Sequence, residues 1–133
     1  MRHAPTGADL LDVARRQMLD VLVPALPAEH RYAALMVANA MAIAGREMRN
    51  GAAGQEEELW ALSALYGEVP EAEPGDPQAM AQALEAIHRQ VCADIRAGRM
   101  DPHRPEHDAL RATLEELAQD RVAETNPRYL SGT

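Results

Sequence analysis

The sequence contains no phenylalanine and no lysine, and it has a single cysteine, Cys92. Without lysine the chain cannot form a Walker-A phosphate loop, a Schiff base or a lysine general base. A lone cysteine cannot form a disulfide within the chain, so we expect a reducing, cytoplasmic location. The first residues have no apolar core of the kind that marks a signal peptide, and no apolar run is long enough to span a bilayer.

Serine and glycine-rich motifs are also scarce. The two serines, Ser63 and Ser131, do not lie in a strand–turn–helix elbow, and no glycine-rich nucleotide loop is present. These absences argue against serine catalysis, dinucleotide binding and ATP hydrolysis. We therefore assign no catalytic residue and no cofactor. The sequence leaves catalysis open, but it favours a protein that performs no chemistry.

Acidic residues outnumber basic ones. All 13 basic residues are arginines, and they face 21 acidic residues, for a net charge of −8. Phosphate contacts need a basic stripe, and none is visible. The same balance disfavours an anionic membrane surface. We expect neither a nucleic-acid partner nor a membrane partner.

The residues that are abundant favour helices. The chain has 26 alanines together with many leucine, methionine, glutamate, glutamine and arginine residues, all good helix formers, and few residues that prefer strands. The apolar periodicity predicts an all-α fold, a single domain over residues 1–133 built as an antiparallel bundle of about five helices. We place these helices at residues 7–23, 28–49, 53–66, 77–97 and 106–125.

Capping residues support these boundaries. Thr6 and Asp9 are spaced as a capping box, and Asp76 precedes a proline in the first turn of the helix at 77–97. Gly51, Gly67 and Gly98 follow predicted helices at the positions where helices commonly stop.

The second predicted helix is unusually apolar. From Ala33 to Gly45, Asn39 is the only polar residue among thirteen. A helix that is apolar on every side is buried on every side. We therefore expect this helix at the centre of the bundle, with the Asn39 amide enclosed.

Tyr32, Asn39 and Arg46 lie seven residues apart on this helix and so share one face. One interpretation is structural, with a paired buried amide and an Arg46 ion pair. A second is a ligand pocket, in which Arg46 holds a carboxylate or phosphate. A third is that this helix meets a second copy of the chain, forming a homodimer.

The best metal-like grouping is Glu85, His88 and Cys92, spaced at helical intervals on the helix at 77–97. Di-iron bundles need two Glu-x-x-His motifs and further glutamates, and a second motif is absent. These residues are therefore weak metal candidates, and we expect them at the edge of the core. His103 and His107, four residues apart at a turn, likewise lack further ligands.

Three segments, PTGADLLDVARRQM, LPAEHRYAALMVANAMAIAGREM and NPRYL, together resemble an uncharacterised family of small all-helical bacterial proteins. Members of that family are often encoded beside kinase-like phosphotransferases, of the aminoglycoside or choline kinase type, and acyl-CoA dehydrogenases. The resemblance implies an accessory role in acyl-CoA or other small-molecule catabolism, and it transfers no catalytic residue. Arg128 and Tyr129, in the last segment, either fold back on the bundle or form the rim of a site.

Three functions follow from these observations. The first, which we favour, is a non-catalytic helical accessory protein that forms a homodimer and binds a protein partner such as a phosphotransferase. The alternative is a small-ligand-binding protein or an unrecognised enzyme, with a pocket along Tyr32, Asn39 and Arg46. A metal protein using Glu85, His88 and Cys92 is the third.

Overall fold

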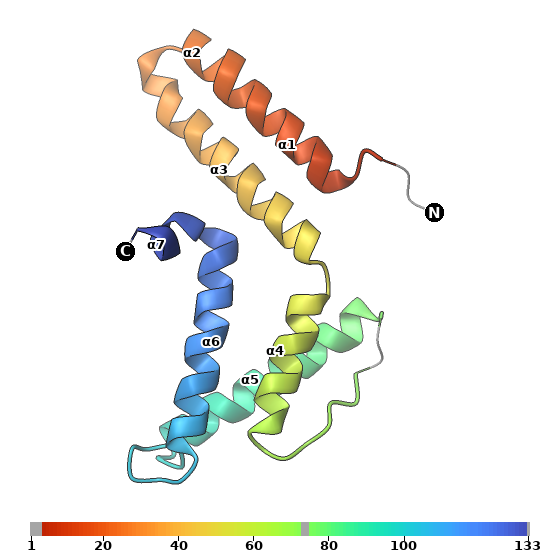
Figure 1. Ribbon diagram of the computed structural model, residues 1–133, viewed down its shortest axis with the longest axis vertical. Coiled ribbons are helices and arrows are strands. Elements are labelled where there is room, and N and C mark those ends of the chain that lie inside the picture. Colours follow the sequence, from red (N-terminus) through yellow and green to blue (C-terminus); the bar gives the residue numbers. More distant parts are fainter. Residues whose placement is uncertain (1–3, 73–74, 133) are drawn as a thin grey trace. The chain divides into compact units, whose positions relative to one another are not determined.

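The computed structural model describes residues 4–72 and 75–132, and every regular element in these ranges is helical (Figure 1). The elements are α1 (Gly7–Gln17), the π-helical segment η1 (Met18–Leu22), α2 (Val23–Ala25), α3 (Ala28–Asn50), α4 (Ala53–Ala64), α5 (Pro77–Arg96), α6 (His107–Thr125) and α7 (Pro127–Ser131). The all-α prediction and its five long helices are confirmed. Among the described residues, no helix combines the length and apolarity that crossing a bilayer requires.

The predicted capping and stop residues act as expected. The Thr6 hydroxyl accepts a hydrogen bond from the Asp9 amide, and the Asp9 carboxylate accepts one from the Thr6 amide. The Asp76 carboxylate accepts hydrogen bonds from two amides in the first turn of α5. Gly51, Gly67 and Gly98 all have positive φ, which glycine adopts at little cost and which ends a helix.

Two boundaries differ from prediction. The first helix does not end at Pro24 but passes through η1 into α2, since Pro24 lies in the first turn of α2, where the missing N–H is tolerated. The tail after Asn126 forms one further turn, α7, which starts at Pro127. Both differences arise because proline is compatible with the first turn of a helix.

The contacts divide the chain into two compact units, one comprising Met1–Gly51 with Ala123–Thr133 and the other Ala52–Val122. The prediction of one folding domain over residues 1–133 stays a prediction. The first unit is built on an antiparallel hairpin of α1 and α3, joined through η1 and α2 (Figure 1).

Small residues form the seam of this hairpin. The buried residues are Ala8 on α1 and Ala34, Ala38 and Gly45 on α3. A Cβ at Gly45 would lie 3.9 Å from the Cβ of Leu11, so the two helices approach closely there. Among the described residues, this unit buries no side chain larger than alanine.

The position predicted for the second helix is therefore wrong. α3 is buried only along its seam, and Asn39 is exposed rather than enclosed. Tyr32 is 74% exposed, and Leu35, Met36 and Val37 are each close to half exposed. The apolar residues of α3 lie on every side of the helix, and within the first unit only those along the seam are buried.

The second unit has a core of large side chains. α4 and α5 contact each other, and the core contains Leu59, Leu62, Met80, Leu84, Ile87, Val91, Met100 and Leu110. Met80, Leu84, Ile87 and Val91 recur every three or four residues along α5 and are buried. Ile95, the next apolar residue at this spacing, is 45% exposed, and its neighbour Asp94 is buried instead. That exchange places a carboxylate in the core, where it needs partners.

Candidate functional site

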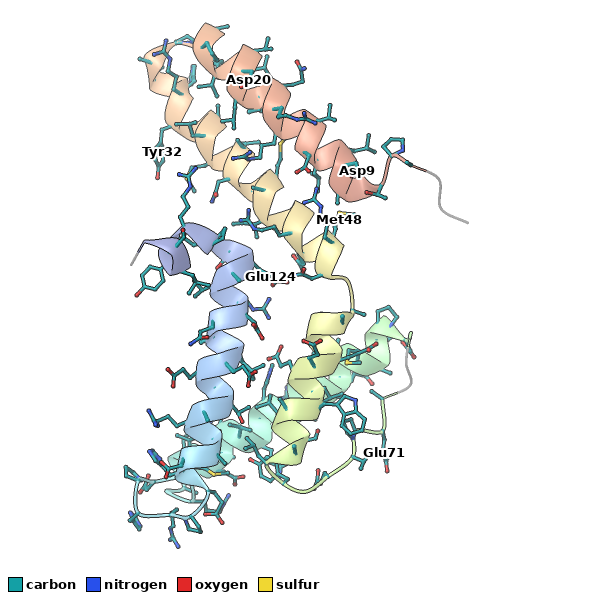
Figure 2. The ribbon with its side chains drawn as sticks, viewed as in Figure 1. Asp9, Asp20, Tyr32, Met48, Glu71 and Glu124 are labelled. Atoms are coloured by element: carbon teal, nitrogen blue, oxygen red, sulfur yellow. The ribbon has the colours of Figure 1, made fainter. Side chains whose placement is uncertain are left out.

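The strip predicted on the second helix lies on the surface of the first unit. Tyr32 and Asn39 are exposed, and in Figure 2 Tyr32 points away from α1. Arg46 is half-buried, and its Nε donates a hydrogen bond to the backbone carbonyl of Glu124. The Glu124 carboxylate also accepts a hydrogen bond of 2.6 Å from Asn50 Nδ2 (Figure 2 labels Glu124). Arg46 and Asn50 therefore tie the end of α6 to α3.

Arg128 and Tyr129 belong to α7, in the same unit as this strip. Both are exposed, and Tyr129 is 72% exposed. The carbonyl of Arg128 accepts a hydrogen bond from the Ser131 hydroxyl, which closes the short helix. Ligand binding by Tyr32, Asn39, Arg46, Arg128 and Tyr129 stays a prediction.

The weak metal candidates on α5 each have a different environment. The Glu85 carboxylate pairs with Arg89, and His88 Nε2 lies 2.8 Å from Glu58 Oε1 on α4. Cys92 is exposed. Among the described residues, no group of three or more histidine, cysteine, aspartate or glutamate side chains has the arrangement of a metal site. His107 Nδ1 lies 3.0 Å from the Met100 carbonyl, so this histidine closes the turn before α6.

A polar cluster that sequence reasoning missed lies in the second unit. The hydroxyl of Tyr66, just beyond α4, donates a hydrogen bond of 2.8 Å to Asp94 Oδ2 on α5. Arg99 pairs with Asp94 Oδ1 at 2.6 Å, and the Arg99 amide bonds to the Asp94 carbonyl. Asp94 is 8% exposed, so these partners replace the water that the carboxylate loses.

This cluster shifts two pKa values in opposite directions. The hydrogen bond from Tyr66, followed by the hydrogen bond from Arg99, lowers the pKa of Asp94 below its ordinary value. Burial, followed by the hydrogen bond to Asp94, raises the pKa of Tyr66 to about 12. The hydrogen bonds from Tyr66 and Arg99 to Asp94 hold the end of α4 against the end of α5.

The shifts give a pH dependence whose sign can be worked out. Because the pKa of Asp94 is lower in the folded state, its stabilisation is present above the unfolded carboxyl pKa and is lost as the pH falls through the lowered folded value. Because the pKa of Tyr66 is raised in the folded state, this residue stabilises the fold below pH 10, the ordinary pKa of tyrosine. That stabilisation is lost as the pH rises through about 12.

Ultraviolet absorbance titration of the three tyrosines tests this assignment. We expect one tyrosinate to form near pH 12 in the wild-type protein, and this transition should be absent from Tyr66→Phe. In Asp94→Asn the transition should move part of the way towards 10, because burial remains when the carboxylate charge is removed. A late transition that persists in Tyr66→Phe would contradict the assignment.

A pocket of about 250 Å³ opens beside this core. It is lined by Leu65, Met100, Pro105, Glu106, Ala109 and Leu110. The lining is apolar apart from Glu106, whose side chain is exposed to solvent. Such a pocket offers apolar contact and one exposed carboxylate.

Charge is distributed unevenly between the units. Residues 52–122 contain 15 of the 21 acidic residues and six arginines, an excess of nine negative charges. The first unit has seven arginines and six acidic residues. The acidic unit also carries the only tryptophan, Trp60 on α4, which is 55% exposed. Glu56 and Glu57 precede Trp60 by one helical turn and lie on the same side of α4.

Comparison with known proteins identifies a family but no activity. No curated protein and no solved structure matches the chain. The family model described as a domain of unknown function (DUF6285) matches residues 24–129, which is most of the chain and includes α3 to α6. The chain therefore belongs to the DUF6285 family.

Proposed function

We propose that the chain is a non-catalytic helical interaction protein that binds a protein partner through its acidic second unit. The observation that carries this proposal is the exposed Trp60 beside Glu56 and Glu57, on the unit that holds the excess of negative charge. More than half of this large aromatic side chain is left in water in the free protein. Tryptophan is among the residues that most often dominate protein–protein binding energy.

The charges specify the chemistry of the partner. A basic surface is attracted by the acidic unit, which speeds its encounter, and an arginine from that surface can stack on the indole ring of Trp60 while pairing with Glu56 or Glu57. A nucleic acid or an anionic lipid surface is repelled by the same charges. We therefore propose a protein with an arginine- or lysine-rich patch as the partner.

The resemblance noted above supplies a candidate for this partner. We propose that the protein is a bacterial cytoplasmic accessory protein that associates with a phosphotransferase of the aminoglycoside or choline kinase type, in a system for acyl-CoA or other small-molecule catabolism. We also propose that the chain acts as a homodimer. The absence of lysine and of a catalytic serine motif supports an accessory role rather than a catalytic one.

Binding between the purified chain and such a phosphotransferase from the same genome tests the proposal. We expect a complex that weakens as salt is added, because exposed charges are screened. Trp60→Ala should weaken binding by at least tenfold, since truncating a central interface tryptophan costs about 2 kcal/mol or more.

The matched control is Ala64→Ser, one turn after Trp60 on the same side of α4 and also exposed. It should leave the affinity within about twofold, because it removes no large contact area. Equal affinities for wild type and Trp60→Ala would show that the acidic unit is not the binding surface. A phosphotransferase that fails to bind at low salt would remove this partner.

A further inference from the structure

The hairpin of α1 and α3 lacks a core of its own. Its buried residues are alanine and glycine, whereas the second unit buries leucine, isoleucine, valine and methionine side chains. A seam of alanine and glycine buries little apolar area to offset the conformational entropy of ordering two long helices. The hairpin therefore needs a cover on its exposed apolar surface.

The contacts distinguish the two faces of the hairpin. On one face Arg49 of α3 forms an ion pair with Asp12 of α1. On the other face the end of the Met48 side chain lies against Gly7 and would have to shift to admit a Cβ at residue 7. Since successive residues turn by about 100° around a helix, these contacts fix which residues share each face.

The face that contains Met48 is mostly apolar, with Glu29 and Glu47 at its edge, and we call it the apolar face. It consists of Gly7, Leu10, Ala14 and Val21 from α1 and η1, with Ala33, Val37, Ala40, Ala44 and Met48 from α3. Leu10, Val21 and Met48 are more than half exposed, and Val37 is 45% exposed. The opposite face carries the Asp12–Arg49 pair and the exposed Arg16. The hairpin is thus amphipathic as a unit.

We propose, resting on the homodimer proposed above, that a second copy of this chain covers the apolar face, so that two hairpins pack face to face as a four-helix bundle. On α3 the face residues recur at intervals of four, three, four and four, the spacing along which helices pack in such bundles. Ala33, Ala40 and Ala44 are small enough to let the backbone of the second hairpin approach closely, and the larger Leu10 and Val21 lie on the neighbouring helix.

Charge and area are both compatible with a second copy. Two copies meeting through this face bring together hairpins with nearly balanced charge, while the excess negative charge belongs to the other unit. α1 to α2 spans 19 residues, about 28 Å, and two adjacent helices are about 20 Å wide, giving roughly 560 Å² of projected area. The accessible area is larger than this projection, and a stable interface buries about 800 Å² per partner.

Light scattering on Ala40→Glu tests the inference. The wild-type chain should be a dimer at micromolar concentration, whereas Ala40→Glu should weaken association at least 100-fold, because it buries two unpaired carboxylates in the interface. Val37→Glu should act in the same way. The matched control is Asn39→Glu, which adds the same charge at the adjacent exposed position, about 100° around α3 and off the apolar face.

Every outcome bears on the inference. If Ala40→Glu loses helical circular dichroism together with association while Asn39→Glu retains both, the inference is supported, because the hairpin then depends on its cover. A wild-type chain that is monomeric, or an Ala40→Glu chain as dimeric as Asn39→Glu, overturns it. Binding of a lipid vesicle or of another protein to the apolar face, in place of a second copy, also overturns the inference. Trp60→Ala should remain a dimer, so this inference and the proposed partner fail separately.

Discussion

Leu62→Ala should lower the free energy of unfolding by about 2–5 kcal/mol, the largest effect of any substitution considered for this chain. Leu62 on α4 is the largest fully buried side chain among the residues that the structure describes, at 2% exposure, and it belongs to the core of the second unit. Its truncation removes apolar burial and leaves a cavity that the surrounding side chains fill only in part. Urea unfolding followed by circular dichroism, at fixed chain concentration, measures the change.

Leu114→Ala on α6 is the matched control. Leu114 is 40% exposed, so the same truncation removes less buried area and leaves no closed cavity. We expect Leu114→Ala to lower the free energy of unfolding by less than half as much as Leu62→Ala. Equal losses at both positions would show that the core is not centred on α4 and α5.

Ala38→Leu should lower the free energy of unfolding by about 1–3 kcal/mol or more, through overpacking. Ala38 is 2% exposed and lies in the seam between α1 and α3, where the helices are close enough to admit only small residues. A leucine there must push the helices apart or leave its preferred rotamer. The same urea measurement detects the loss.

Ala86→Leu is the control for this substitution. Ala86 is an exposed residue of α5, and alanine and leucine both favour helices, so the change should stay within about 0.5 kcal/mol. If Ala38→Leu is as harmless as Ala86→Leu, the seam is looser than the structure shows.

Local features of the fold could be predicted from the sequence. The Thr6–Asp9 capping box and the Asp76 cap involve residues only two or three positions apart, and both form as expected. Gly51 and Gly98 end helices for an equally local reason, the ease with which glycine adopts positive φ. Such interactions do not depend on how distant parts of the chain pack.

The environment of α3 could not be predicted in this way. The run from Ala33 to Gly45 shows that the helix has little polar surface, but composition does not reveal what covers that surface. The structure buries one narrow line of small residues, with Ala38 at its centre, and leaves Asn39 exposed. Apolar surface of this kind can be covered within a chain or between chains, and sequence periodicity is the same in both cases.

The Tyr66–Asp94–Arg99 cluster was missed because its main hydrogen bond joins residues 28 positions apart. One signal was nevertheless present in the sequence. Asp94 follows Val91 by three residues and Ile87 by seven, which places it on the apolar face of α5. An acidic residue at such a position indicates a buried, paired carboxylate. The identity of its partners still required the fold.

The central claim is that two copies of this chain associate through the exposed apolar face of the hairpin. Sedimentation equilibrium of the unmodified wild-type chain tests this claim most directly. We expect a mass twice that of the 14.5 kDa chain at micromolar concentration, decreasing towards the single-chain mass on dilution. A single-chain mass at every concentration would contradict the account.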